Sequence, residues 1–134
     1  MVLHVQHTKG YHRVVVCSRD TDVLVLFLHH NIANEVWMQA GTAAKPRNIP
    51  INEVRQSLPC EVIAALPAFH SITGCDTTSS LHGHGKRTAW KAFIRCPRLL
   101  LPFGNITTDD FSTAERFVVS IYSPTSNALS VNAF

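Results

Sequence analysis

The first thirty residues contain two apolar segments of different kinds. Residues 13–18 (RVVVCS) form a short β-branched run without alternation, which predicts a strand buried on both faces, as in a parallel sheet. The apolar block of residues 20–31 follows directly and begins with two acids. We favour a helix here, capped by Asp20 or Asp22, over the alternative of a second strand.

Aliphatic residues alternate in the next segment. Val36 and Met38 occupy alternate positions, and Ile49 and Ile51 do so again after a turn at residues 41–46. This pattern predicts strand, turn and strand. Pro50 would confine the second strand to an edge of the sheet, because proline cannot donate to a ladder.

Helical spacing dominates the rest of the chain. Asn52 can cap a short helix ending near residue 57, and Pro59 suits the first position of a longer one that ends at Gly74. Its expected apolar stripe contains an internal proline, Pro67, that should bend it. The residues of this stripe are Val62, Ile63, Leu66, Phe69 and Ile72.

Two further helices complete the prediction. Residues 85–96 should bury one face and expose another that carries Arg87, Lys91 and Arg95; the expected buried residues are Ala89, Ala92, Phe93 and Cys96. The last helix should begin at Thr108 or Asp109 and bury Phe111, Ala114, Phe117, Val118 and Ile121. Residues 123–134 have no clear period and are expected to form a loose tail.

Composition narrows the class of protein. The chain has 134 residues, of which 46% are apolar and 16% charged, so one globular domain is expected. No apolar run approaches the roughly 20 residues of a membrane span, and the first residues resemble no signal peptide. We therefore expect an intracellular protein, nuclear or cytoplasmic, without membrane contact. The four cysteines, at positions 17, 60, 75 and 96, are isolated, which favours buried free thiols over disulfides or a zinc site.

Positive charge is concentrated in the second half. Charges cancel over residues 1–76, whereas no acid occurs between Thr77 and Thr108. The cations of the second half are Lys86, Arg87, Lys91, Arg95, Arg98 and Arg116. Such a field suits a polyanionic partner, although a solvated helix face would look the same in sequence.

Three acids are candidate ligands for a divalent cation. Asp20 and Asp22 follow the first predicted strand at i, i+2, and Asp76 follows the glycine that ends a long helix. Oxygen ligands of this kind suit Mg²⁺ or Mn²⁺. In open α/β sheets, ligands gather at the carboxyl ends of strands, where these acids could meet. The alternative is that they only cap helices.

A glycine-rich turn precedes the basic helix. Gly83 and Gly85 would allow a ligand close to the backbone, and the following helix N-terminus would attract an anion. The candidate phosphate-binding residues are His82, Gly83, His84, Gly85, Lys86, Arg87 and Lys91. The segment lacks the nucleotide P-loop pattern, and a simple glycine turn is the alternative.

The order of these motifs resembles a known family. "VVVCSRDTDVLVL", followed by "ITGCDTTSSLHGHGKRTAWKAF", is similar to the flap-endonuclease group of the PIN-like nuclease superfamily, over residues 13–95. The resemblance implies an α/β domain with a mostly parallel sheet flanked by helices, and a helix-turn-helix DNA clamp at about 61–95. It also implies that Asp20, Asp22 and Asp76 hold one or two Mg²⁺ or Mn²⁺ ions for phosphodiester cleavage. The partner would be DNA, such as a branched or flapped duplex, with RNA left open.

One departure from the family affects the expected activity. Family members carry further acids upstream, but residues 1–19 contain no Asp or Glu. We therefore expect residues 1–12 to be a lead, and residues 13–122 to be one part of the domain, completed by a longer chain or a partner. The sequence leaves open whether the chain is a nuclease, a catalytically inactive nucleic-acid-binding or scaffold remnant, or a purely structural module.

Overall fold

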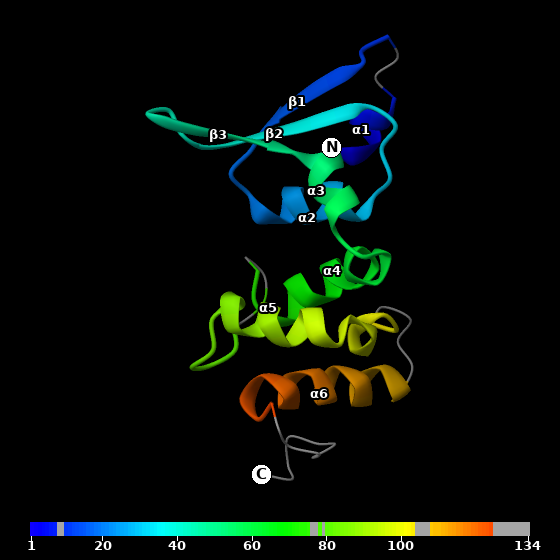
Figure 1. The fold of residues 1–134 in the computed structure, drawn as a ribbon, viewed down its shortest axis with the longest axis vertical. Coiled ribbons are helices and arrows are strands. Elements are labelled where there is room, and N and C mark those ends of the chain that lie inside the picture. The colour runs from blue at the N-terminus through cyan, green and yellow to red at the C-terminus, as the bar shows by residue number, and fades with distance from the viewer. Residues whose placement is uncertain (8–9, 76–77, 79, 104–107, 125–134) are drawn as a thin grey trace. The chain divides into compact units, whose positions relative to one another are not determined.

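The computed structural model describes residues 1–7, 10–75, 78, 80–103 and 108–124. The chain divides into two compact units, Met1–Pro59 and Cys60–Phe134 (Figure 1). The first is an α/β unit with a small mixed sheet and helices, and the described part of the second is helical. No helix in the described parts has both the length and the apolar character needed to cross a membrane.

The first unit contains a three-stranded sheet in the order β1-β2-β3. Its elements are α1 (Val2–Gln6), β1 (Arg13–Cys17), α2 (Thr21–His29), β2 (Glu35–Thr42), β3 (Lys45–Pro50) and α3 (Ile51–Ser57). β1 is parallel to β2, and β2 is antiparallel to β3. The prediction of a mostly parallel sheet is therefore wrong, because the short turn between β2 and β3 allows only antiparallel pairing. The predicted helix over the block after Asp20 is confirmed as α2.

Only one face of this sheet is buried. Register pairs Val16 with Met38, and both side chains are buried, as is Val36. The opposite face carries Val15, which is 54% exposed and lies beside Trp37. The predicted burial of β1 on both faces is wrong, because α2 and α3 lie on the same side of the sheet (Figure 1).

The β2–β3 hairpin follows the sequence prediction. Gly41 has φ of +88°, and a Cβ there would lie 2.4 Å from the carbonyl oxygen of Lys45. Glycine is thus required at this position by both conformation and space. The second strand lies at an edge of the sheet, as Pro50 predicts.

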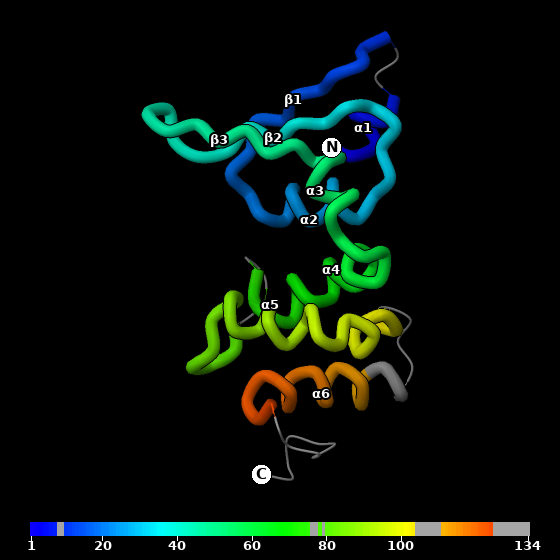
Figure 2. Tube along the Cα trace, viewed as in Figure 1, coloured from blue at the N-terminus to red at the C-terminus, as the bar shows by residue number. Residues whose placement is uncertain are grey.

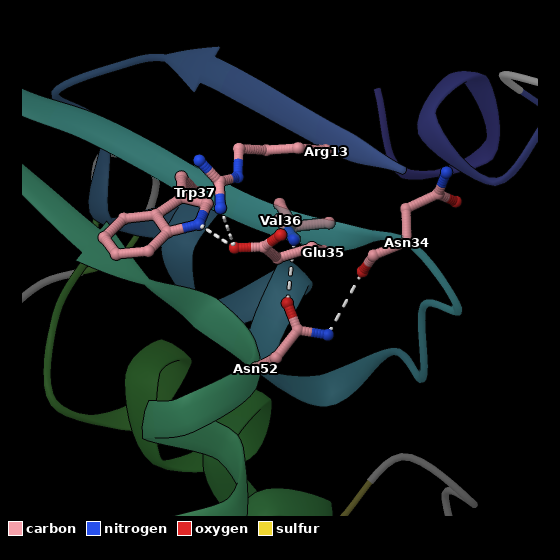
Figure 3. Close-up of polar contacts among 6 residues, drawn as sticks. All are labelled: Arg13, Asn34, Glu35, Val36, Trp37 and Asn52. Atoms are coloured by element: carbon pink, nitrogen blue, oxygen red, sulfur yellow. Dashed lines mark hydrogen bonds and ion pairs between the residues drawn. The ribbon is translucent and has the colours of Figure 1, made fainter. Parts of the chain in front are cut away.

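The junction of β3 and α3 differs from the prediction. Ile51, expected in the strand, begins α3, and Pro50 occupies the capping position expected for Asn52. The Asn52 side chain instead accepts from the amide of Val36 at 2.8 Å and donates to the carbonyl of Asn34 at 3.1 Å (Figure 3). A tertiary contact has therefore replaced the local cap.

The second unit packs its helices around aromatic rings. Its elements are α4 (Cys60–Ile72), α5 (Lys86–Arg95), the 3₁₀ helix η1 (Pro97–Leu100) and α6 (Thr108–Tyr122). The rings of Phe69 and Phe93 stack at 4.6 Å, and Phe117 approaches Phe69 edge-on at 6.3 Å. These three residues come from α4, α5 and α6, which lie side by side (Figure 2).

Most predicted buried residues of these helices are confirmed. Val62, Ile63, Leu66, Ala89 and Ala92 are buried with the three phenylalanines. Pro67 lies inside α4, as predicted.

Other predicted core positions of the second unit are wrong. Cys96 follows α5 and is exposed, because the helix ends at Arg95. Phe111 is 67% exposed, and Ala114 and Val118 are only half-buried, whereas the predicted Phe117 and Ile121 are buried together with Val119. The side chains of Thr108 and Asp109, expected to cap α6, and residues 125–134 of the expected tail lie outside the described parts.

The four cysteines are free thiols, as predicted, but their predicted burial is wrong. Cys17 and Cys60 are exposed, as is Cys96, and Cys75 is half-buried. Their positions at element ends explain the exposure: Cys17 ends β1, Cys60 begins α4 and Cys75 follows Gly74.

Candidate nucleic-acid interface

The D-x-D segment forms the junction between β1 and α2. Asp20 is the capping residue of α2, and its Oδ1 accepts a hydrogen bond from the amide of Asp22 at 2.8 Å. The Asp20 amide donates to the hydroxyl of Ser18 at 3.2 Å. The prediction of a cap is confirmed, and a carboxylate pair lies directly after a strand that has a parallel neighbour.

An open depression of about 550 Å³ lies at the same end of β1. Cys17, Ser18 and Arg19 line one side of it. The β2–β3 hairpin, from Gln39 to Ala43, supplies most of the rest. Arg19 provides a positive charge in this depression, next in sequence to the acids.

The three predicted metal ligands come from two segments far apart in the sequence. Among residues 1–7, 10–75, 78, 80–103 and 108–124, no three His, Cys, Asp or Glu side chains are grouped to hold a metal ion. Asp76, the third predicted ligand, lies outside these residues. Metal binding by Asp20, Asp22 and Asp76 stays a prediction.

The segment after α4 folds back onto that helix. Gly74 has φ of +99°, and a Cβ there would lie 2.9 Å from the Cα of Ser80, so glycine is required. The hydroxyl of Thr78 accepts from the amide of Cys75 at 3.1 Å and donates to the carbonyl of Ser71 at 2.7 Å. These contacts define the path of the chain that leaves α4.

The glycine turn is held by the end of α6. The Tyr122 hydroxyl donates to the carbonyl of His82 at 2.8 Å, and its ring meets that of His84 edge-on at 4.5 Å. Gly83 has φ of +74°, whereas Gly85 has an ordinary φ of −76°. Sequence reasoning missed Tyr122, because nothing in its local pattern indicates a contact forty residues away.

Gly85 has room for a side chain. No described atom lies within 4 Å of a Cβ built there, and its conformation suits any residue. The described fold therefore gives no reason for glycine at this position. Close approach of a ligand to the backbone is a remaining reason.

The N-terminus of α5 has an unfavourable charge arrangement. No described side chain caps it at Gly85, and its first turn contains Lys86 and Arg87 but no acid. The positive end of a helix dipole favours anions, so two cations in this turn oppose it. A bound anion would relieve this conflict.

A basic stripe extends from this terminus along α5. Arg87, Lys91 and Arg95 are exposed, while Ala89, Ala92 and Phe93 are buried on the opposite face. The predicted amphipathic helix is confirmed. Three cations thus lie on one exposed face of a ten-residue helix.

Lys86 is oriented differently from this stripe. Its Nζ lies 2.9 Å from Nδ1 of His70 and 2.6 Å from the carbonyl oxygen of Gly74. His70 is 8% exposed and is therefore a hydrogen-bonded residue of the core. The phosphate contact predicted for Lys86 would need this arrangement to change.

Arg98 is also engaged elsewhere. Its guanidinium forms an ion pair with Glu61 at 2.7 Å. The hydrogen bond from Arg98 lowers the pKa of the Glu61 carboxyl, so the carboxylate is charged at neutral pH. The positive charge of Arg98 is therefore balanced by Glu61 within the fold. No such ion pair is described for the three cations of the basic stripe.

Comparisons with known proteins give no relative of this chain. No family model, curated protein or solved structure matches this chain.

Proposed function

We propose that the second unit binds the phosphate backbone of nucleic acid through the turn at His82–Gly85 and the basic stripe of α5. The single observation that carries this proposal is the N-terminus of α5, which no described side chain caps, continued by Arg87, Lys91 and Arg95 on one exposed face. No acid occurs near this stripe in sequence, from Thr77 to Thr108. The stripe spans about 12 Å along the helix axis, at about 1.5 Å per residue.

The expected binding mode is independent of base sequence. Guanidinium and ammonium groups contact phosphate oxygens, and such contacts set position without reading bases. Free amides at the start of α5 would add hydrogen bonds to one phosphate. Duplex DNA with a branch or flap is the partner that the family resemblance favours, and RNA is the alternative outcome of the test.

A second candidate function is metal-dependent cleavage of the bound strand. The observation that favours it is the D-x-D pair at the strand–helix junction, the position that the resemblance predicts. Asp20, Asp22 and Asp76 would supply carboxylate oxygens to Mg²⁺ or Mn²⁺. When bound, such an ion lowers the pKa of water and stabilises the leaving oxygen of a phosphodiester. The protein would then be a nuclease of PIN-like, flap-endonuclease type rather than an inactive binding remnant.

The binding test compares charge deletions on and off the stripe. We expect Arg87→Met, Lys91→Met and Arg95→Met each to weaken binding of a flapped duplex. Each should also reduce the slope of log K against log salt concentration by about 0.9. Arg98→Met is the matched control, because this arginine is paired with Glu61. Equal effects of all four substitutions, or binding without salt dependence, would exclude the stripe as the interface.

The cleavage test uses the same flapped substrate and a matched RNA. We expect Mg²⁺- or Mn²⁺-dependent cutting that disappears in Asp22→Asn and in Asp76→Ala. Glu53→Gln, an exposed acid on α3, is the control for simple loss of charge. Binding without cutting would identify the chain as the inactive form, and cutting that survives Asp76→Ala would exclude the predicted ligand set.

A further inference from the structure

The ring of Tyr122 carries an inference that rests on the proposed nucleic-acid binding and narrows its substrate class. We infer that Tyr122, held by His84, is a stacking platform for one base of an unpaired nucleic-acid strand. The second unit then binds a single strand, or the unpaired part of a branched duplex, more tightly than a continuous duplex. It recognises unpaired bases in addition to phosphates.

Tyr122 comes from α6 but lies at the start of α5. The two helices pack together and run in opposite directions, so the end of α6 is beside the start of α5 (Figure 2). The Tyr122 hydroxyl donates to the carbonyl of His82 at 2.8 Å, and 4.5 Å separates the ring centroids of Tyr122 and His84. His84 directly precedes Gly85, the residue before α5. A nucleotide is long enough to place its base on the Tyr122 ring and its phosphate at this helix terminus.

The orientation of the Tyr122 ring is fixed before a ligand binds. Its hydroxyl is anchored on His82, and the His84 ring meets it at an angle of 75°. The neighbouring residues Val119 and Ile121 are each 3% exposed, which anchors the end of α6 in the core. A tyrosine side chain that is already ordered loses little conformational entropy when it binds a partner.

Tyr122 also keeps surface available for a ligand. The residue is 45% exposed even with these two contacts made. Other rings near α5 are used within the unit: Phe69, Phe93 and Phe117 are buried, and Trp90 packs against Phe69 with 5.4 Å between ring centroids. Tyr122 therefore offers an aromatic surface at the glycine turn that the packing of the described core does not use.

A stacking ring beside a row of cations suits an unpaired strand. Every base has a π-face that can stack on an aromatic side chain, so such binding tolerates any base sequence. In a continuous duplex the bases are stacked on one another, and exposing the face of one base costs unstacking energy. The basic stripe contacts phosphates, which single and double strands both carry, so it cannot distinguish them. The Tyr122 ring supplies that distinction.

Two single-stranded oligonucleotides of equal length test the platform in the unmodified protein. One carries bases, and the other carries abasic residues with the same number of phosphates. We expect the first to bind about tenfold more tightly, because stacking is lost with the bases. The slopes of log K against log salt concentration should agree, because the two strands have the same charge. Equal affinities would overturn the platform.

Substitutions of Tyr122 separate stacking from support of the turn. Tyr122→Leu should weaken binding of the strand with bases by about tenfold, and leave binding of the abasic strand and of a continuous duplex unchanged. Tyr122→Phe keeps the ring and loses the hydrogen bond to His82, so it should retain the preference for bases. Phe111→Leu is the matched control, because it removes another exposed ring from the same helix. Equal weakening of all three ligands by Tyr122→Leu would show that the ring only supports the turn, and would overturn the platform.

Adenosine, which carries a base but no phosphate, tests the platform independently of the proposed function. We expect adenosine at millimolar concentration to shift the NMR signals of the Tyr122 ring and not those of the Phe111 ring. If oligonucleotides bind with the expected salt dependence but their bases make no difference to affinity, the platform fails and phosphate binding stands. If no oligonucleotide binds at low salt and adenosine still shifts the Tyr122 signals, the proposed function fails and the platform stands as a base-binding site.

Discussion

The amide of Val36 donates a 2.8 Å hydrogen bond to the side-chain Oδ1 of Asn52 (Figure 3). Pro50, the last residue of β3, pairs with Trp37, so β3 offers no further partner to β2 at Val36. Asn52 supplies that partner from the first turn of α3. A side chain thus continues the ladder where the strand changes into a helix.

Asn52→Ala should destabilise the first unit. The substitution leaves the amide of Val36 and the carbonyl of Asn34 without this partner, which should lower the free energy of unfolding by about 1–3 kcal/mol. Urea unfolding of the variant gives the measurement. Asn48→Ala, at an exposed position in β3, is the control and should change little. A midpoint equal to that of the unmodified protein would show that water replaces the side chain without cost.

Substitutions of Asp20 can separate its capping role from a metal-binding role. Asp20→Ala removes the acceptor for the amide of Asp22 and should cost about 1 kcal/mol, whereas Asp20→Asn and Asp20→Ser keep a capping oxygen. All three remove the carboxylate, so all three should abolish metal-dependent cleavage. Thermal unfolding and a cleavage assay on the same variants provide the two readouts. Full cleavage by the stable Asp20→Asn variant would rule out Asp20 as a ligand.

The ion pair of Glu61 and Arg98 should contribute to stability only above acidic pH. The hydrogen bond from Arg98 holds the pKa of Glu61 below its ordinary value of 4.5 in the folded state. A lowered carboxyl pKa stabilises the fold above the unfolded pKa, and this contribution is lost as the pH falls through the folded value. The effect should be modest, because the two side chains are 78% and 43% exposed.

Arg98→Met should return the pKa of Glu61 towards 4.5. A carbon NMR titration of the carboxyl groups measures this directly. Glu35 is the internal control, because its own pKa is lowered by hydrogen bonds from Arg13 and Trp37, and it should not move. If Glu61 titrates identically in both proteins, the ion pair is absent in solution.

Gly85→Ala should affect binding without affecting the fold. Its φ is ordinary and no described atom lies within 4 Å of the added Cβ, so the melting temperature should stay within about 2 °C. If phosphate lies against this backbone, the methyl group should weaken binding of the flapped duplex by about tenfold. Gly83→Ala, at φ of +74°, should instead lower stability by about 1 kcal/mol or more. Unchanged affinity of the Gly85→Ala variant would show that phosphate does not lie against the backbone at Gly85.

Local pattern was sufficient where neighbours in sequence determine the structure. The apolar spacing of residues 60–72 and 86–95, the hairpin at Gly41 and the cap at Asp20 all depend on contacts within a few residues. Pro50 ends β3 and Gly85 directly precedes α5, whereas Gly41, Pro46 and Pro67 lie inside elements. The basic stripe of α5 was also evident, because helical periodicity alone places its cations on one face.

Contacts distant in sequence decided the rest. Val15 is exposed because the helices cover the other face of the sheet. Asn52 does not cap α3, because its side chain accepts a hydrogen bond from the amide of Val36. Lys86 faces α4 because His70 and Gly74 provide two acceptors there. The amino-acid sequence by itself thus determined most of the elements and their charged faces, through short-range sterics and periodic burial, although it did not indicate α1 or η1. The tertiary structure determined the partner of each long polar side chain. A lysine or asparagine can reach several acceptors, and packing determines which of them lies near.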